Sequence, residues 1–266
     1  MKVLIHQTPE RAVRCVADIL VKRLDLQPDT VLGLATGGTM EAVYARLIKA
    51  YRGGHVSFDR ARSFNLDEYI GLPPDHPCSY WRYMEDRLFD HVDFGAGATC
   101  LPRGDAADPE AEAAAYERAI ARSGDIGLQL LGLGANGHIG FNEPSSSLSS
   151  LTRIKTLTRS TRAANARFFD DPDDVPRLAI TMGIGTILRA EEIVLLGFGE
   201  GKAEAAAAMI EGPVSASCPA SALQLHDKVT VVLDQAAASR LKLREYYELV
   251  HPGGGDAVIT PFQPAA

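Results

Sequence analysis

The pattern of apolar and polar positions along the chain predicts strands that alternate with helices. Short segments at residues 3–5, 31–34, 62–66, 128–133, 193–198 and 229–233 predict six strands. Apolar residues at helical spacing follow the first two segments, and Thr8 before Pro9 is a typical helix start. Residues 80–89 and 111–121 also predict helices, as do the Ala-rich stretches after the last two strands.

These strands predict an α/β fold, because segments that are apolar throughout suit a parallel sheet buried on both faces. We expect an open, mostly parallel, Rossmann-like sheet flanked by helices, formed by residues 1–250 as a single domain. Residues 144–174 are rich in Ser, Thr and Arg, interrupt the alternation and predict a lid-like insertion. Residues 251–266 contain several Gly and Pro residues and predict a loose tail.

The composition of the chain argues against several classes of protein. The chain has 266 residues, of which 46% are hydrophobic, and a formal net charge of −7, opposite to the basic surface typical of nucleic-acid binders. Its sequence contains no apolar run long enough to predict a membrane span. The four cysteines have no zinc-binding spacing, so we expect no bound metal. These features predict a cytoplasmic protein and allow an anionic small molecule as its substrate.

A Gly-rich turn after the second predicted strand is a candidate phosphate site. Gly37 and Gly38 let the backbone approach a ligand, and Thr39 is expected to cap the following helix. Free N–H groups at a helix start attract anions such as phosphate. An ordinary strand-to-helix turn explains the same residues equally well, so this motif alone leaves both interpretations open.

Two adjacent carboxylates, Asp67 and Glu68, follow the third predicted strand, at the edge where open parallel sheets bind ligands. Because neighbouring side chains point in different directions, one carboxylate can face a crevice while the other makes a structural contact. A carboxylate in a partly desolvated crevice has a raised pKa and can act as a general base. From position alone, two solvent-exposed loop acids are the favoured interpretation.

Residues 132–144 follow the fourth strand and carry a histidine among glycines. Their Gly-x-Gly-x-x-Gly string does not open a helix, since Gly140, Pro144 and serines follow, and we therefore reject a dinucleotide site. Flanking glycines argue against a packed core histidine at His138, and Glu143 is placed to hydrogen-bond its ring. The loop predicts a proton-transfer site, whereas the lack of a second His or Cys at suitable spacing disfavours a metal.

Basic residues follow this loop, and most of them are expected to be solvent-exposed. The set comprises Arg153, Lys155, Arg159, Arg162, Arg167 and Lys202. Lys202 comes directly after a strand and at a helix start, which places it at the ligand-binding edge of the sheet. Arg and Lys side chains in such positions can bind a phosphate.

Taken together, these segments resemble the glucosamine-6-phosphate deaminase family. The resemblance extends over about residues 2–250 and follows the family's order and spacing. The matching segments are residues 32–39, 64–72, 76–77, 79–80, 132–144, 152–169, 199–203 and 223–226.

The resemblance implies roles for individual residues. Asp67 resembles the base that moves a proton between C2 and C1 of the open sugar, and His138, paired with Glu143, resembles the group that opens the ring. Asn136 stands where the family has Asp or Asn, and because an amide cannot relay a proton, a positioning role is implied. The implied phosphate-binding residues are Thr36, Gly37, Gly38, Thr39, Arg167 and Lys202.

The implied reaction converts D-glucosamine 6-phosphate and water to D-fructose 6-phosphate and ammonia, and it needs no cofactor. Galactosamine 6-phosphate, the galacto epimer, is an alternative substrate, because only a few contacts distinguish the orientation of one hydroxyl group. A sugar-phosphate lactonase of the same fold is the alternative enzyme, although it would have less use for Asp67. A sugar-phosphate sensor would carry a helix-turn-helix, and a strand beginning at Val3 leaves no room for one.

Some family members are hexamers activated by an acetylated amino-sugar phosphate, so the resemblance also raises a homo-oligomer as a hypothesis. Their effector pocket resembles Ser146, Ser147, Arg153 and Lys155 of this chain. A C-terminal tyrosine completes that pocket in those members, whereas this chain has Glu245 at the matching position and Tyr246 one residue on. Regulation by this ligand is therefore a hypothesis.

Overall fold

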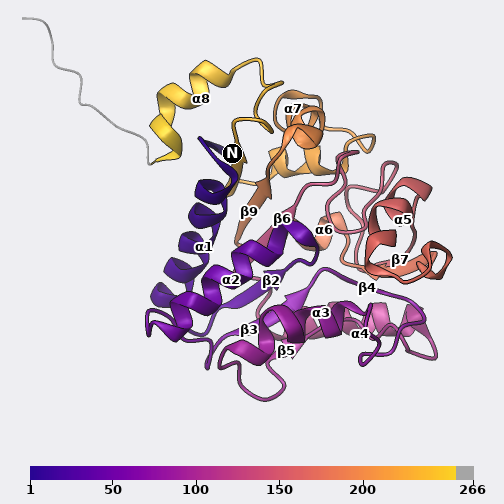
Figure 1. Cartoon of the computed structure of the whole chain (residues 1–266). Helices are drawn as coiled ribbons and strands as arrows, with labels where there is room; N and C mark the ends of the chain where they lie inside the picture. Colours follow the sequence, from indigo (N-terminus) through magenta and orange to yellow (C-terminus); the bar gives the residue numbers. More distant parts are fainter. Residues whose placement is uncertain (256–266) are drawn as a thin grey trace, which may run out of the picture.

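The computed structural model describes residues 1–255, and its centre is a seven-stranded sheet of order β1-β10-β9-β6-β2-β3-β5 (Figure 1). Each neighbouring pair in this sheet is parallel. The six predicted strands are all present, and β5 is an addition. The strands are β1 (Lys2–His6), β2 (Val31–Leu34), β3 (Arg62–Asn65), β5 (Thr99–Cys100), β6 (Leu128–Gly132), β9 (Glu192–Gly197) and β10 (Val229–Asp234).

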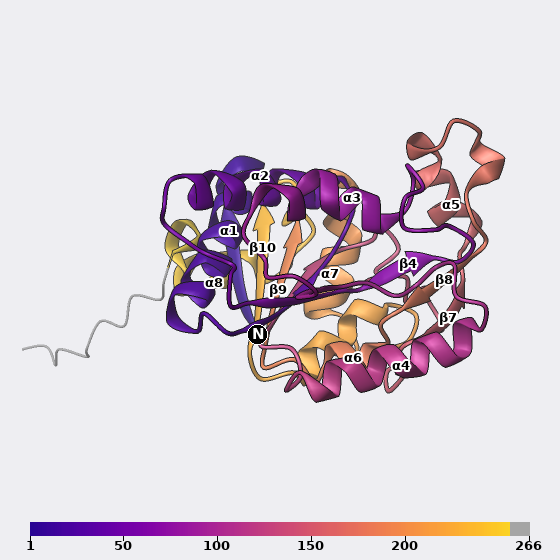
Figure 2. The same ribbon diagram turned by 90° about the horizontal axis from the view of Figure 1, so that it is seen from below.

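Helices cover both faces of this sheet, with α1, α2 and α3 on one face and α4 and α6 on the other (Figure 2). Consecutive residues such as Leu130 and Leu131 are both fully buried, so the sheet is covered on its two faces as the apolar strands predicted. The helices are α1 (Pro9–Leu26), α2 (Gly38–Arg52), α3 (Tyr80–Arg87), α4 (Pro109–Arg122), α5 (Arg159–Asn165), α6 (Ile184–Ile187), α7 (Ala203–Glu211) and α8 (Arg244–Val250).

A second, antiparallel sheet of order β4-β8-β7 lies beside the main sheet (Figure 2). Its strands are β4 (Asp67–Tyr69), β7 (Arg153–Thr156) and β8 (Leu178–Thr181). Because β4 follows β3 after a single residue, Leu66, the chain changes sheets at this point. In the new register Asp67 is the partner of Thr181. The sequence analysis did not predict this sheet.

Two predictions near the C-terminus need correction. The Ala-rich residues 235–240 form turns rather than a helix, because Asp234 Oδ1 accepts the N–H of Ala237 (2.8 Å) and closes a tight turn. Residues Pro252–Gly254 form a 3-10 turn against β1, where a side chain at Gly254 would lie 2.6 Å from the ring of His6. The predicted loose tail is thus packed in this part, and residues 256–266 lie outside the described residues.

The predicted insertion at residues 144–174 contains β7, α5 and two 3-10 turns, η2 (Ala166–Phe168) and η3 (Pro172–Asp174). Helix α5 starts after its N-cap Thr158, whose hydroxyl accepts a hydrogen bond from the N–H of Thr161 (3.2 Å). Side chains of α5 line the cavity described below, so the insertion covers a ligand-sized space. Within residues 1–255, no helix has the length and apolar character of a membrane span.

Candidate active site

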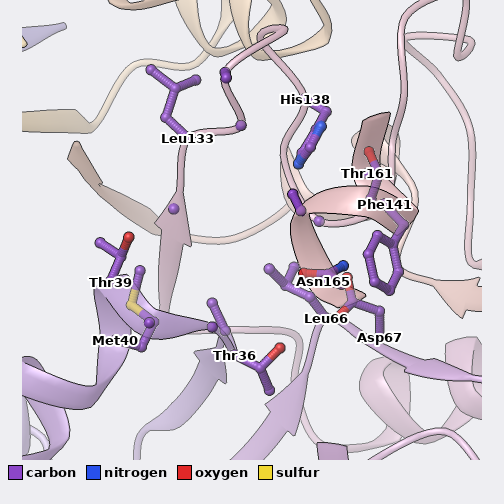
Figure 3. A pocket seen from close by; sticks show the side chains of 18 of the residues that line it. Thr36, Thr39, Met40, Leu66, Asp67, Leu133, His138, Phe141, Thr161 and Asn165 are labelled. Carbon is purple, nitrogen blue, oxygen red and sulfur yellow. The ribbon is translucent and has the colours of Figure 1, made fainter. Parts of the chain in front are cut away.

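A cavity of about 310 Å³ opens at the C-terminal ends of β2, β3 and β6 (Figure 3). Figure 3 shows Thr36, Asp67 and His138 around the same space. The sequence-predicted residues that line it are Thr36, Gly37, Gly38, Thr39, Asp67, Asn136, His138, Arg167 and Lys202. Glu143 does not line the cavity, but it contacts His138 from behind. Strand ends far apart in the sequence thus bring these candidates together.

Asp67 is a buried carboxylate, only 5% exposed, at the start of β4. Burial, followed by the charge of Glu68, raises the pKa of Asp67 from 3.8 to about 7, against the opposing hydroxyl of Thr181. The histidine loop packs directly on this carboxylate, since a side chain at Gly140 would lie 3.2 Å from Asp67 Oδ2. The interpretation of Asp67 and Glu68 as solvent-exposed loop acids was wrong.

Glu68 points away from the cavity and has a structural role. Its carboxylate accepts the backbone N–H groups of Tyr69 (2.8 Å), Tyr80 (2.9 Å) and Trp81 (2.9 Å). These contacts fix the start of α3 against β4. The prediction that the two adjacent carboxylates serve different purposes is consistent with this arrangement.

The loop after β6 presents His138 to the cavity. Gly137 has a φ of +81°, which L-residues rarely adopt, and a side chain at Gly134 would lie 2.4 Å from the imidazole ring. These two glycines therefore turn the chain and make room for the ring. His138 Nδ1 lies 3.5 Å from Glu143 Oε2. This distance is longer than the usual hydrogen bond, but it allows an ion pair when the imidazole is protonated. No helix follows this loop directly, as the rejection of a dinucleotide site required.

Glu143 is buried and held by donors from several directions. Asn136 Nδ2 donates to Glu143 Oε2 (2.8 Å), while Asn136 Oδ1 accepts the N–H of His138 (3.2 Å). Thr161 donates its hydroxyl to Glu143 Oε1. Burial by itself would raise the pKa of Glu143, but the contacts with His138, Thr161 and Asn136 lower it to about 2. The carboxylate is therefore ionised and can orient the imidazole.

The start of α2 forms a second wall of the cavity. The helix begins at Gly38, and Gly37 at the N-cap has a φ of +100°. Thr39 therefore lies in the first turn, and the prediction that it caps the helix was wrong because the glycine turn starts the helix earlier. The N-cap Gly37 offers no side-chain cap, and Tyr83 donates its hydroxyl to the Gly37 carbonyl (2.9 Å). The loop is thus held in the cavity wall, and the free N–H groups of a helix start suit an anionic ligand.

Two cations stand beside this helix start. Arg167, in η2, lies over Gly38, where an added side chain would be 3.2 Å from Arg167 Nη2. Burial, and then the nearby charge of Arg167, lower the pKa of Lys202. Positive charges held this close to each other and to a helix N-terminus favour an anionic ligand, such as a phosphate.

The residues that resemble an effector pocket lie apart from this cavity. Arg153 and Lys155 occupy alternate positions on β7, and burial followed by the charge of Arg153 lowers the pKa of Lys155. Ser146 is buried, and its hydroxyl lacks a hydrogen-bond partner within the described part of the chain, as does Arg153 Nη2. Ser147 contacts Ser149 at the surface (Oγ–Oγ 3.2 Å).

Some residues of the cavity were not predicted. Tyr80 lines it and stacks on Phe141 with ring centroids 5.9 Å apart, and Thr161 and Asn165 reach it from α5. Thr158 is a readable N-cap for α5, but nothing local in the sequence joins α5 to Glu143. Among residues 1–255, no His, Cys, Asp and Glu side chains gather in a group of three or more suited to a metal ion.

Comparison with known proteins agrees with this geometry. A family model described as glucosamine-6-phosphate isomerases/6-phosphogluconolactonase matches residues 3–232. The chain belongs to this family. Within the family, a protein named glucosamine-6-phosphate deaminase from Cellvibrio japonicus (strain Ueda107) is 54% identical over 248 residues, which are 93% of this chain and 94% of that relative.

Solved structures show the same architecture. A monomeric glucosamine-6-phosphate deaminase superposes with a TM-score of 0.88 and 48% identity, covering 90% of this chain and 100% of that one. The 6-phosphogluconolactonase of Trypanosoma brucei superposes with a TM-score of 0.72 but only 18% identity, covering 90% of this chain and 98% of the other. At that identity the likeness to the lactonase concerns the fold alone.

Proposed function

We propose that this chain is an enzyme that converts D-glucosamine 6-phosphate and water to D-fructose 6-phosphate and ammonia, a step of amino-sugar breakdown. The observation that carries the proposal is that Asp67 and His138 line one cavity together with Arg167 and Lys202. The cations and the start of α2 suit the phosphate, while the carboxylate and the imidazole suit proton transfer at the other end of a six-carbon sugar.

Ring opening is the first step, because the closed sugar has no carbonyl group at C1. His138 takes the proton of the C1 hydroxyl and returns a proton to the ring oxygen as the C1–O bond breaks. Glu143 holds the imidazole from behind and balances the positive charge that forms on it. Asn136 keeps both groups in place through its amide.

Proton transfer between carbons follows on the open chain. Asp67 removes the proton from C2 and delivers it to C1, which converts the 2-amino aldehyde into a 2-imine. Water then adds to C2, and ammonia leaves to give the 2-ketone. A carboxyl with a pKa of about 7 is a stronger base than an ordinary aspartate yet remains substantially ionised at neutral pH.

The direct test is to incubate the purified protein with glucosamine 6-phosphate and to measure ammonia and fructose 6-phosphate together. We expect equal amounts of the two products. The same assay with galactosamine 6-phosphate distinguishes the epimers, and 6-phosphogluconolactone tests the lactonase alternative. Turnover of the lactone without ammonia release from either amino sugar would refute the proposal.

Two variants test the assigned roles. Asp67→Asn should abolish ammonia release while substrate binding survives, because the base is lost and the phosphate contacts remain. His138→Gln should slow the closed-ring substrate more than an open-chain analogue. An equal loss on both substrates would contradict the ring-opening role of His138.

Regulation and assembly belong to the same proposal. The separate cluster of Ser146, Ser147, Arg153 and Lys155 is a hypothetical site for N-acetylglucosamine 6-phosphate. It is supported by Ser146 Oγ and Arg153 Nη2, which are buried and have no hydrogen-bond partner among residues 1–255. A homo-oligomer would be needed for a neighbouring tyrosine to reach it. A hyperbolic velocity curve that this ligand leaves unchanged would contradict the regulation hypothesis. A monomer in sedimentation experiments would contradict the homo-oligomer hypothesis. We place the enzyme in the cytoplasm, a proposal that cell fractionation tests.

A further inference from the structure

Two side chains at the start of α5, Thr158 and Thr161, connect the lid-like insertion to Glu143, the partner of the catalytic histidine. Glu143 Oε2 faces Asn136 and His138, whereas Glu143 Oε1 faces the start of α5. There it accepts the hydroxyl of Thr161 and also that of Thr158 (3.1 Å). One buried carboxylate thus joins the loop that carries the imidazole to the helix that covers the cavity.

Thr161 is well placed to be the dominant contact. It is 6% exposed, it lines the cavity (Figure 3), and its hydroxyl donates to Glu143 Oε1. Thr158 serves a second purpose as N-cap of α5, where its Oγ1 accepts the N–H of Thr161 (3.2 Å). Substitution of Thr158 would therefore disturb the helix, whereas the Thr161 hydroxyl can be removed without losing the cap.

The same short segment reaches the phosphate end of the cavity. α5 runs directly into η2, which carries Arg167 beside Gly38. Only five residues lie between Thr161, which contacts Glu143, and Arg167, which faces the proposed phosphate end of the cavity. A ligand that fixes Arg167 therefore also fixes the position of α5.

We propose that Thr161 is a positioning residue through which the lid helix α5 orients Glu143 and, through Glu143, the imidazole of His138. This inference rests on the proposed function and deepens it. Docking of α5 completes the His138–Glu143 pair, so the ring-opening step depends on the insertion being seated over the substrate. When α5 is not docked, Glu143 keeps its contact with Asn136 but loses the two hydroxyl donors, Thr158 and Thr161, that fix its other oxygen.

Thr161→Val tests this role, because valine keeps the shape of threonine and removes the hydroxyl. We expect kcat for glucosamine 6-phosphate to fall ~10- to 100-fold, the range for losing a hydrogen bond to a charged group, with a much smaller change in KM. Thr161→Ser should restore most of the rate. Thr230→Val, a half-buried position on β10 away from the cavity, is the matched control and should leave kcat unchanged.

A double-mutant cycle separates positioning from a general loss of structure. If Thr161 acts through the histidine pair, Thr161→Val should cost little further activity in a His138→Gln background. If Thr161 only stabilises the fold, the two losses should multiply, and that result would overturn the inference. A change in KM would not distinguish positioning from a loss of structure. The cycle is therefore measured on kcat.

A second readout does not require turnover. The Glu143 carboxyl carbon can be followed by NMR as pH is varied, and removing the Thr161 donor should raise the pKa of Glu143 from about 2. The value should return in Thr161→Ser and stay unchanged in Thr230→Val. An unmoved titration in Thr161→Val would overturn the positioning role, whereas a wild-type enzyme that releases no ammonia would refute only the proposed function.

Discussion

Replacing Asp67 by asparagine should remove catalysis and stabilise the protein in the same substitution. The carboxyl group lies in the cavity wall with its pKa raised from 3.8 to about 7, chiefly by burial and then by the charge of Glu68. The folded state therefore holds the proton more tightly than the unfolded chain does. Asparagine has a similar shape and no charge to bury, so Asp67→Asn removes this cost.

The size of the effect follows from the difference between the two pKa values. A carboxyl that titrates at about 7 instead of 3.8 corresponds to ~4 kcal/mol of lost stability when fully ionised, as an upper limit. The sign is that of a raised pKa. Below pH ~4 the carboxyl is protonated in both states and costs nothing. The cost appears as pH rises from there to about 7 and is constant above it.

The assay is chemical denaturation of both proteins at several pH values between 4 and 9. The free energy of unfolding of Asp67→Asn should exceed that of the wild type by an amount that grows up to pH ~7, to between ~2 and ~4 kcal/mol. Asp25→Asn, an exposed position at the end of α1, is the matched control and should give a small, pH-independent difference. A stability gain at Asp67 that is absent or independent of pH would refute the burial argument.

Three further predictions concern activity. The kcat/KM for glucosamine 6-phosphate should fall as pH drops below about 7, because Asp67 must be ionised to act as a base, and a pH–rate profile with its acid limb near 4 would contradict this. Arg167→Met should raise KM ~10- to 100-fold and weaken inhibition by inorganic phosphate, as initial rates would show, while Arg159→Met has little effect. Gly134→Ala should lower kcat ~100-fold or more, because its side chain would lie 2.4 Å from the ring of His138. Gly95→Ala, where the nearest atom is 3.4 Å away, is its control, and equal activity of the two variants would exclude the steric argument.

Most of the central sheet could be predicted because its inner strands are dominated by buried apolar residues. The runs that became β1, β2, β6, β9 and β10 are buried on both faces and bounded by turns, so pattern alone located them. β5 is only two residues long, too short for any periodicity. The sheet formed by β4, β7 and β8 escaped prediction because β4 begins with two carboxylates and pairs with a strand far along the chain.

The candidate site was predictable to the extent that it lies at strand ends. The loops after β2, β3 and β6 meet at one edge of a parallel sheet, so their polar residues could be grouped before any coordinates were known. Thr161 and Tyr80 could not be grouped with them, because their positions depend on how the insertion and α3 fold back over the edge. The cap assigned to Thr39 failed for a local reason, since a positive φ at Gly37 starts the helix earlier.

The change of sheets at Leu66 accounts for both the position and the basicity of Asp67. Had β3 continued in the main sheet, residue 67 would have emerged at the open edge, where water lowers the pKa of a carboxyl to its ordinary range. Instead β4 pairs with β8, which sets Asp67 opposite Thr181 and under the loop at Gly140. The pairing that removes water from the carboxylate also aims it into the cavity. Basicity and destabilisation at Asp67 are therefore one physical effect, and a substitution that relieves the second should abolish the first.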